Sequence, residues 1–180
     1  YIADTDALLA FPYKDGDTRI TARPRKIVDL PAGPINHHWT KNVVVRDDGQ
    51  IYVSVGSNSN VGENGLDAEK DRASIWEILP DGRHNMYAYG LRNPVGMAFR
   101  PGTQELWAVV EERDEIGSDL VPDYLTGVVP GGFYGWPFSY YGDHVDLRVQ
   151  QNPDLVATAR KPDYAMGPHV AVLGLTFAEG

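Results

Sequence analysis

The feature that most constrains this chain is a recurring pair of short apolar strands joined by a tight turn. The first pair is residues 42–45 and 51–55 around Asp48-Gly49, and the second is residues 95–99 and 106–110 around Pro101-Gly102. Short apolar runs that flank Asp-Gly or a similar turn are typical of β-hairpins. The chain is therefore predicted to consist of repeated hairpins.

A second kind of apolar strand lies between the hairpins, at residues 74–78 and, earlier, at residues 7–11. Equivalent positions recur at intervals of 50 to 55 residues, as from Tyr1 to Tyr52, which is near the ~50 residues of kelch-type blades. No segment has a helical period, and Gly and Pro interrupt the chain throughout. These patterns predict an all-β fold with the architecture of a β-propeller.

The final stretch, residues 172–177, repeats the inner-strand pattern of residues 95–99 and stops where the next turn should begin. Tyr1 lies inside an apparent strand. We therefore expect residues 1–180 to form a partial propeller domain of about three blades that starts and ends inside blades. Such a piece would expose sheet edges, and we expect it to be inactive by itself.

Composition narrows the classes of partner. The formal net charge is −9, and no cluster of Lys and Arg is present, so a nucleic-acid partner is not expected. No stretch reaches the roughly 18 apolar residues of a membrane helix, so no membrane segment is expected either. The absence of Cys excludes disulfides and thiolate metal sites. The residues themselves do not indicate a cellular location.

Alignment of the repeats brings three polar residues to one position. When Asn42 is set against Gly96, the residue four positions earlier is His38 in one repeat and Arg92 in the next, and the third copy falls beside His169. Because inner strands line the channel of a propeller, these side chains should share one rim of it. Each alone could be a solvated loop residue, but their common phase favours a functional site.

Several motifs occur in order along the chain: NHHWTKN at 36–42, GSNSNVGEN at 56–64, GLRNPVG at 90–96, GGFYGWP at 131–137 and GLTF at 174–177. Together they resemble the soluble glucose/sorbosone dehydrogenase family, and most closely its L-sorbosone dehydrogenase branch. The resemblance implies a six-bladed propeller that uses pyrroloquinoline quinone (PQQ) and calcium to oxidise an aldose or sorbosone-like sugar. It also implies an external electron acceptor, such as a dye, a quinone or a cytochrome, and a periplasmic or secreted location.

By this resemblance His38 matches the catalytic His, and Arg92 and Asn93 match a quinone-contacting pair. A neutral imidazole can take a hydroxyl proton near neutral pH, and a fixed guanidinium stabilises negative charge that grows on a quinone oxygen. We therefore predict that His38 and Arg92 are catalytic. His38 is preferred over His37 because neighbouring side chains of an extended segment point in opposite directions.

The acidic run that begins at Glu111 follows the strand 106–110 directly. Calcium prefers oxygen ligands, including backbone carbonyls. The family dehydrogenases carry Gln-Gly-Pro here, whereas this chain has Glu-Glu-Arg. The expected calcium ligands are the carbonyls of Glu112 and Arg113 and the side chain of Asp114, with Glu111 beside the cofactor. The same run could also be a solvated surface loop.

Further assignments depend on less specific patterns. By the resemblance, a second, structural calcium uses the Asp119 carboxylate and the Tyr134 carbonyl. Asn58, Asn60 and His169 are candidates for contacts to the sugar, although Asn-rich strand exits are also common turns. Trp136 offers either a stacking surface for the sugar or buried packing.

Two other functions are consistent with a propeller. A calcium-dependent lactonase or hydrolase would need a cage of Glu, Asp and Asn side chains rather than an Arg92-Asn93 pair. A non-catalytic binding module would need neither metal nor quinone. An anion-binding Arg favours the quinone enzyme. NAD is not expected, because no Gly-x-Gly-x-x-Gly motif opens a βαβ unit.

Overall fold

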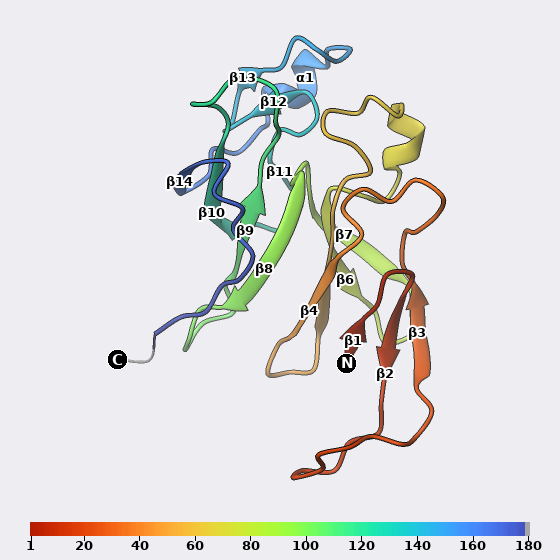
Figure 1. Cartoon of the computed structure of the whole chain (residues 1–180). Coiled ribbons are helices and arrows are strands. Elements are labelled where there is room, and N and C mark those ends of the chain that lie inside the picture. Colours follow the sequence, from red (N-terminus) through yellow and green to blue (C-terminus); the bar gives the residue numbers. More distant parts are fainter. Residues whose placement is uncertain (179–180) are drawn as a thin grey trace.

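The computed structural model describes residues 1–178 as an all-β fold, which confirms the predicted fold class (Figure 1). The strands are β1 (Ile2–Ala3), β2 (Ala7–Ala10), β3 (Arg25–Asp29), β4 (Lys41–Val45), β5 (Ile51–Val55), β6 (Ser74–Ile78), β7 (His84–Tyr89), β8 (Asn93–Phe99), β9 (Leu106–Glu111), β10 (Pro122–Val128), β11 (Gly132–Phe133), β12 (Ser139–Tyr140), β13 (His144–Val145) and β14 (Tyr164–Pro168). Helical structure in this range is limited to the 3-10 turn η1 (Leu66–Glu69) and the short α1 (Pro153–Val156), and no helix there is long and apolar enough to cross a membrane.

The strands form consecutive sheets in which chain neighbours pair antiparallel. The sheet orders are β1-β2-β3, then β4-β5-β6-β7 with β11 added at the edge, then β8-β9-β10-β14, and the small pair β12-β13. β11 pairs parallel to β7. The two predicted hairpins are confirmed as β4-β5, with Val45 opposite Ile51, and β8-β9, with Phe99 opposite Leu106.

The central sheet is buried on both faces because its side chains alternate between two cores. In β5, every residue is buried. Tyr52 belongs to a core shared with the β8-β9-β10 sheet, whereas Val53 packs with Leu8 in a core shared with the β1-β2-β3 sheet. The apolar and β-branched composition of β5 follows from this position between two neighbouring sheets.

The first strands of successive sheets lie side by side. Asn42 Nδ2 in β4 donates a 2.7 Å hydrogen bond to Val95 O in β8. A Cβ added to Gly96 would lie 2.7 Å from the carbonyl carbon of Gly174, so residues 172–177 run alongside β8. The expected strand at 172–177 is not formed. These residues contact β8 by close packing and belong to no hydrogen-bonded sheet.

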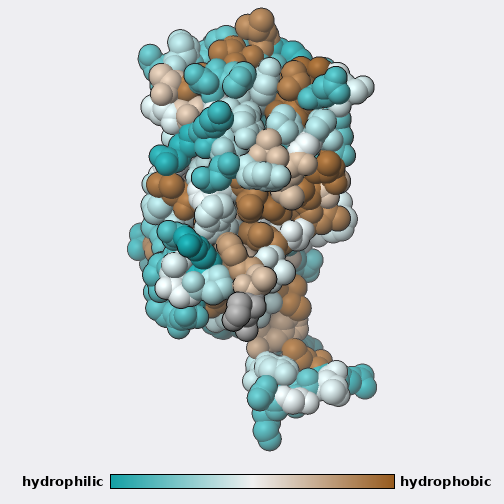
Figure 2. Space-filling model, turned by 90° about the vertical axis from the view of Figure 1, so that its left-hand side faces the viewer, coloured by the Kyte–Doolittle hydropathy of each residue, from teal (hydrophilic) through white to brown (hydrophobic). Residues whose placement is uncertain are grey.

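This succession of sheets is consistent with blades, although residues 1–178 form no closed ring, and the six-blade count stays a prediction. Figure 2 shows apolar side chains across the middle of the face formed by β14 and the residues after it. Exposed apolar residues in this part include Tyr164, Met166, Val170 and Leu173. Apolar patches of this kind mark surfaces that pack against protein, as the predicted neighbouring blade would require.

A long insertion between β10 and β14 covers one end of the molecule (Figure 1). It contains β11, β12, β13 and α1. β11 extends the central sheet through Gly132 opposite Ala88 and Phe133 opposite Tyr89. The insertion thereby ties the third sheet to the outer edge of the second, at the end where the candidate site lies.

Candidate active site

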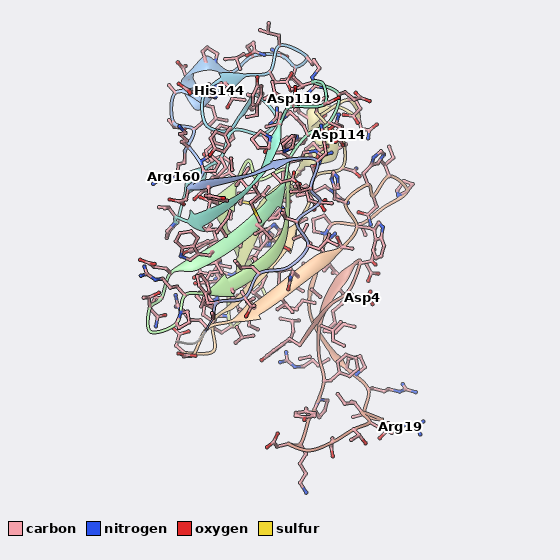
Figure 3. All side chains as sticks on the ribbon, turned by 60° about the vertical axis from the view of Figure 1, so that its left-hand side comes forward. Asp4, Arg19, Asp114, Asp119, His144 and Arg160 are labelled. Carbon is pink, nitrogen blue, oxygen red and sulfur yellow. The ribbon has the colours of Figure 1, made fainter. Side chains whose placement is uncertain are left out.

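The predicted site residues meet at one end of the sheets. In an antiparallel hairpin the start of the first strand and the end of the second lie at the same end. His38 lies shortly before β4, and Arg92 lies directly before β8. Both residues are therefore at the end of the sheets where β5 and β9 finish. Figure 3 shows Asp114 and Asp119 at this end, opposite Arg19.

His38 is half-buried and is oriented through Ser57. Its Nδ1 lies 2.9 Å from both Ser57 O and Ser57 Oγ. The Ser57 hydroxyl donates its proton to Ser59 O at 2.7 Å, so both atoms that face Nδ1 are acceptors. Nδ1 therefore carries the ring proton and Nε2 has the free lone pair. No residue of the described chain forms a hydrogen bond with Nε2.

The electrostatic surroundings keep this imidazole neutral. Burial, followed by the positive charge of Arg92, lowers the pKa of His38 to about 4, although the Ser57 carbonyl opposes the shift. At neutral pH the ring is therefore unprotonated at Nε2, which is the state that a proton acceptor requires.

His37 and His38 lie in a turn rather than in the extended segment on which the preference between them was based. Their environments nevertheless differ. His37 is exposed, and its backbone N–H donates to Asn58 Oδ1 at 3.3 Å. Only His38 is packed against the strand ends; the extended segment assumed for the preference is not formed, and the choice of His38 stays a prediction.

Arg92 is buried, and each nitrogen of its guanidinium has an oxygen partner. Nε donates to Asn60 O at 3.1 Å, and Nη2 to Asn60 Oδ1 at 3.0 Å. Nη1 donates to Glu112 O at 2.7 Å, and the Asp114 carboxylate lies 3.5 Å from Nη2. Burial lowers the pKa of Arg92, while the carboxylates of Glu112 and Asp114 oppose this. The result is a cation with a fixed orientation.

The fold brings Asn93 into close contact with Gly56, and no sequence pattern predicted this contact. Asn93 Nδ2 donates to Glu111 Oε2 at 2.8 Å, whereas its buried Oδ1 has no partner in the described residues. A Cβ on Gly56 would collide with Asn93 Oδ1 and lie 2.5 Å from His38 Cβ. Gly56 is therefore a site residue that sequence reasoning missed. Its signal in the sequence was a glycine directly after the apolar run of residues 51–55.

Directly after β9, Glu112 and Arg113 are buried, whereas Asp114 is exposed and its carboxylate faces Arg92. The Arg113 guanidinium is fully buried and pairs with Glu112 Oε2 at 3.1 Å. The Glu112 N–H donates to Asp123 Oδ1 at 2.7 Å. Of the two predicted carbonyl ligands, Glu112 O already accepts from Arg92, which leaves one lone pair for a metal.

A small cavity of about 190 Å³ adjoins this strand end. Its lining includes Arg92, Glu111, Glu112, Asp114, Asp123 and His169. Within residues 1–178, no three His, Cys, Asp or Glu side chains are grouped closely enough to hold a metal ion. A calcium ion there would need backbone carbonyls, and the oxygen-rich wall is suited to a hard cation.

The residues present fit PQQ in part. Arg92 is suited to an anionic quinone oxygen or carboxylate, whereas the unpartnered Asn93 Oδ1 is buried against Gly56. The three carboxylates of PQQ need more cations than the described residues place near Arg92. The described residues could therefore bind only one side of PQQ.

The other predicted residues are placed as follows. Asp119 is exposed between β9 and β10, whereas Tyr134 is buried and its hydroxyl donates to Gly127 O at 2.8 Å. No hydrogen bond within residues 1–178 joins these two, and the second calcium stays a prediction. His169 lies beside the site, with Nδ1 3.2 Å from Asp114 Oδ1. The Gly117 carbonyl, and then Asp114, raise the pKa of His169.

Asn58 and Asn60 are engaged by the protein itself. The Asn58 amide contacts the backbone of His37 and of Ala68. Asn60 holds Arg92, and its carbonyl also accepts from Trp136 Nε1 at 2.9 Å. Trp136 is buried, which agrees with its packing alternative. These contacts favour positioning roles for the two Asn residues, and contact with a sugar stays a prediction.

Comparisons with known proteins find a relative of known class and two solved structures of similar fold. Aldose sugar dehydrogenase YliI of Escherichia coli (strain K12) is 24% identical over 166 residues, which cover 82% of this chain and 42% of that protein. The holo form of the pyranose dehydrogenase PQQ domain from Coprinopsis cinerea has a TM-score of 0.81 at 19% identity, over 99% of this chain and 54% of that chain. A calcium structure of a Trichoderma reesei enzyme of Carbohydrate-Active Enzymes Family AA12 has a TM-score of 0.78 at 16% identity, over 96% and 54%.

The two structural likenesses show a shared fold. The chain spans about half the length of the relatives it matches. The sequence profile of the family described as Glucose / Sorbosone dehydrogenase matches residues 4–180, which is nearly the whole chain. The chain therefore belongs to the Glucose / Sorbosone dehydrogenase family.

Proposed function

We propose that this chain is part of a PQQ-dependent sugar dehydrogenase in which His38 is the general base. The observation that carries the proposal is the lone pair on His38 Nε2, which has no partner in the described residues. Ser57 fixes the tautomer through Nδ1, and the pKa of about 4 keeps Nε2 unprotonated at neutral pH. Family membership supplies the class of reaction.

The substrate is proposed to be an aldose or a sorbosone-like sugar. When bound, PQQ would accept the hydride that leaves the sugar carbon as the hydroxyl becomes a carbonyl. His38 would take the hydroxyl proton at Nε2 and later release it to solvent, which its low pKa favours. Arg92 would hold an anionic oxygen of the cofactor in a fixed position, and Asn93 and Glu111 would flank it.

Calcium is proposed at the end of β9. The carbonyls of Glu112 and Arg113 and the Asp114 carboxylate are the candidate ligands, and the acidic wall of the adjoining cavity supports a cation there. The ion would supply positive charge beside Arg92. The second site, at Asp119 and Tyr134, stays part of the proposal. A calcium structure of the Trichoderma reesei enzyme of similar fold supports calcium in general and neither site in particular.

The complete protein is proposed to be a six-bladed propeller that passes electrons to an external dye, quinone or cytochrome. Side-by-side packing of β4, β8 and residues 172–177 supports an arrangement of blades around a common axis. The site would then lie on one rim of the channel.

The test is reconstitution of the full-length protein with PQQ and Ca²⁺, separately and together. We expect dye reduction with an aldose or sorbosone only when both are present, and none with NAD. Dye reduction that is independent of PQQ and Ca²⁺ would contradict the proposal. Lactone hydrolysis that needs Ca²⁺ and not PQQ would support the hydrolase alternative, and inactivity without binding of either would support a binding module.

A further inference from the structure

We propose that Arg113, Asp146 and Arg148, named here the arginine brace, position the strand end that holds Arg92. The brace touches neither His38 nor Arg92 directly. Its side chains hold the segment of residues 112–114, and Glu112 O and the Asp114 carboxylate of that segment contact Arg92. The role of the brace in catalysis depends on the function proposed above, whereas its role in holding residues 112–114 in place does not.

Arg113 ties the end of β9 to the long insertion. Its Nη1 donates to Pro137 O at 3.0 Å and to Asp146 Oδ2 at 3.1 Å, and its Nη2 donates to Ser139 O at 2.6 Å. The side chain is fully buried. A buried guanidinium is tolerated only when its donors are matched in this way. The side chain that precedes Asp114 is thus fixed in a single direction.

Asp146 joins Arg113 to Arg148. Arg148 Nη2 lies 2.7 Å from Asp146 Oδ2, and Arg148 Nε donates to Asp146 Oδ1 at 2.9 Å. Burial favours the neutral form of Asp146, but the bonds from Arg148 and Arg113 outweigh it and hold the pKa of Asp146 at about 2. The carboxylate therefore stays ionised between the two guanidinium groups.

Arg148 returns to the site strand. Its Nη1 donates to Asp114 O at 3.0 Å. In the same short segment, Glu112 O accepts from Arg92 and the Asp114 carboxylate approaches the Arg92 guanidinium. The segment of residues 112–114 therefore joins Arg92 to Asp146 and Arg148. A shift of this segment would move two of the oxygen partners that orient Arg92.

Arg148→Ala in the full-length protein is the first test. The Arg148 side chain is 30% exposed, so its removal should leave the sheets folded. Arg100→Ala is the matched control, since it removes the same charge from an exposed 3.1 Å pair with Glu105 at the far end of β8. A melting curve for each variant reports folding.

The first readout is hydrogen–deuterium exchange of the apoprotein. We expect faster exchange in Arg148→Ala at residues 111–115 by about tenfold, because local opening becomes easier, and no change there in Arg100→Ala. Unchanged exchange at residues 111–115 in a folded Arg148→Ala protein would overturn the inference. This readout needs no sugar or PQQ, so it holds even if the proposed reaction fails.

The second readout is steady-state kinetics with PQQ, Ca²⁺ and sugar. We expect Arg148→Ala to lower kcat by about 10- to 100-fold, the scale for a small displacement of a reacting group, with KM changed by less than about threefold. In an Arg92→Lys background, the same substitution should have little further effect. Equal losses in both backgrounds would show that Arg148 does not act through Arg92.

Arg148→Lys covers the case in which the alanine variant fails to fold. A Lys can pair with Asp146 but cannot also reach Asp114 O with a second nitrogen. We expect its exchange and kcat to lie between those of the wild type and Arg148→Ala. Wild-type values in both measurements would overturn the role of the Arg148–Asp114 contact.

Discussion

His38 and Arg92 hold equivalent positions in neighbouring sequence repeats, four residues before Asn42 and Gly96. Their side chains nevertheless differ in how many of their nitrogens are hydrogen-bonded to the protein. His38 is held at one nitrogen only, through Ser57, and its other nitrogen is free. Arg92 is held at all three of its nitrogens by oxygens of Asn60 and Glu112. The two residues lie at the same end of the sheets, and the surrounding loops decide how each side chain is held.

The same loop controls both residues. Ser57 N–H donates to Arg92 O at 2.7 Å, while Ser57 O faces the backbone and the ring of His38. The positive charge of Arg92 in turn helps to lower the pKa of His38. A neutral imidazole with one free nitrogen and a fixed cation are thereby placed beside each other, which suits the reaction proposed above.

The largest effect should come from removing the free lone pair. We expect His38→Ala in the reconstituted full-length protein to lower kcat on the order of 10²- to 10⁴-fold, the range for a general base, with PQQ affinity retained. Steady-state dye reduction and a PQQ titration measure both. His37→Ala is the control, and its kcat should stay near that of the wild type. An equal loss in His37→Ala would contradict the assignment of His38 as the general base.

Arg92→Lys should have the next largest effect. An ammonium group cannot reproduce three directed contacts to Asn60 O, Asn60 Oδ1 and Glu112 O, so buried oxygens would lose partners. We expect kcat/KM to fall on the order of 10²-fold, the scale for one lost electrostatic donor. Arg100→Lys serves as the control. A near-normal rate for Arg92→Lys would remove the fixed guanidinium from the mechanism.

A smaller effect is expected from Gly56→Ala, which tests the space shared by His38 and Asn93. The added Cβ would collide with Asn93 Oδ1 and displace His38. We expect kcat to fall by about tenfold, because small displacements of reacting groups lower rates steeply. Gly127→Ala in β10 is the control, since its Cβ would make only ordinary contacts at 3.5 Å or more. Equal kinetics for the two variants would show that the site tolerates the shift.

The smallest expected change is in the pH profile. Because the pKa of His38 is lowered to about 4, its neutral form is retained as pH falls from 7 to about 5 and is lost only below about 4. The acidic limb of kcat/KM for the free enzyme should therefore fall near pH 4. A limb near pH 6.5 would show that burial and Arg92 do not act on His38 as the structure indicates.

The hairpins were predictable because their information is local. Apolar runs and Asp-Gly or Pro-Gly turns specify β4-β5 and β8-β9 within about fifteen residues of chain, and the repeat phase places His38, Arg92 and His169 at one end. The alternation of Tyr52 and Val53 between two cores follows from strand geometry alone. These features depend on residues close in sequence.

The site contacts were not predictable in this way because they join distant segments. Arg113 was expected to present a carbonyl, and spacing gave no indication that its guanidinium would reach Asp146. Asn60 was interpreted as a residue for the sugar, but it contacts Arg92, which is 32 residues further along the chain. Such pairings depend on how the insertion and the loops pack. The spacing of residues in one sequence does not reveal that packing.

The most direct test of the central claim is the absorbance of PQQ bound to the full-length protein, with Ca²⁺ present and without dye or oxygen, after addition of an aldose or sorbosone. The wild type should reduce its bound quinone in one turnover, and His38→Ala should bind the same amount of PQQ yet reduce it at least about 100-fold more slowly. A wild-type protein whose bound PQQ stays oxidised with every sugar, or a His38→Ala protein that reduces it at the wild-type rate, would contradict the claim.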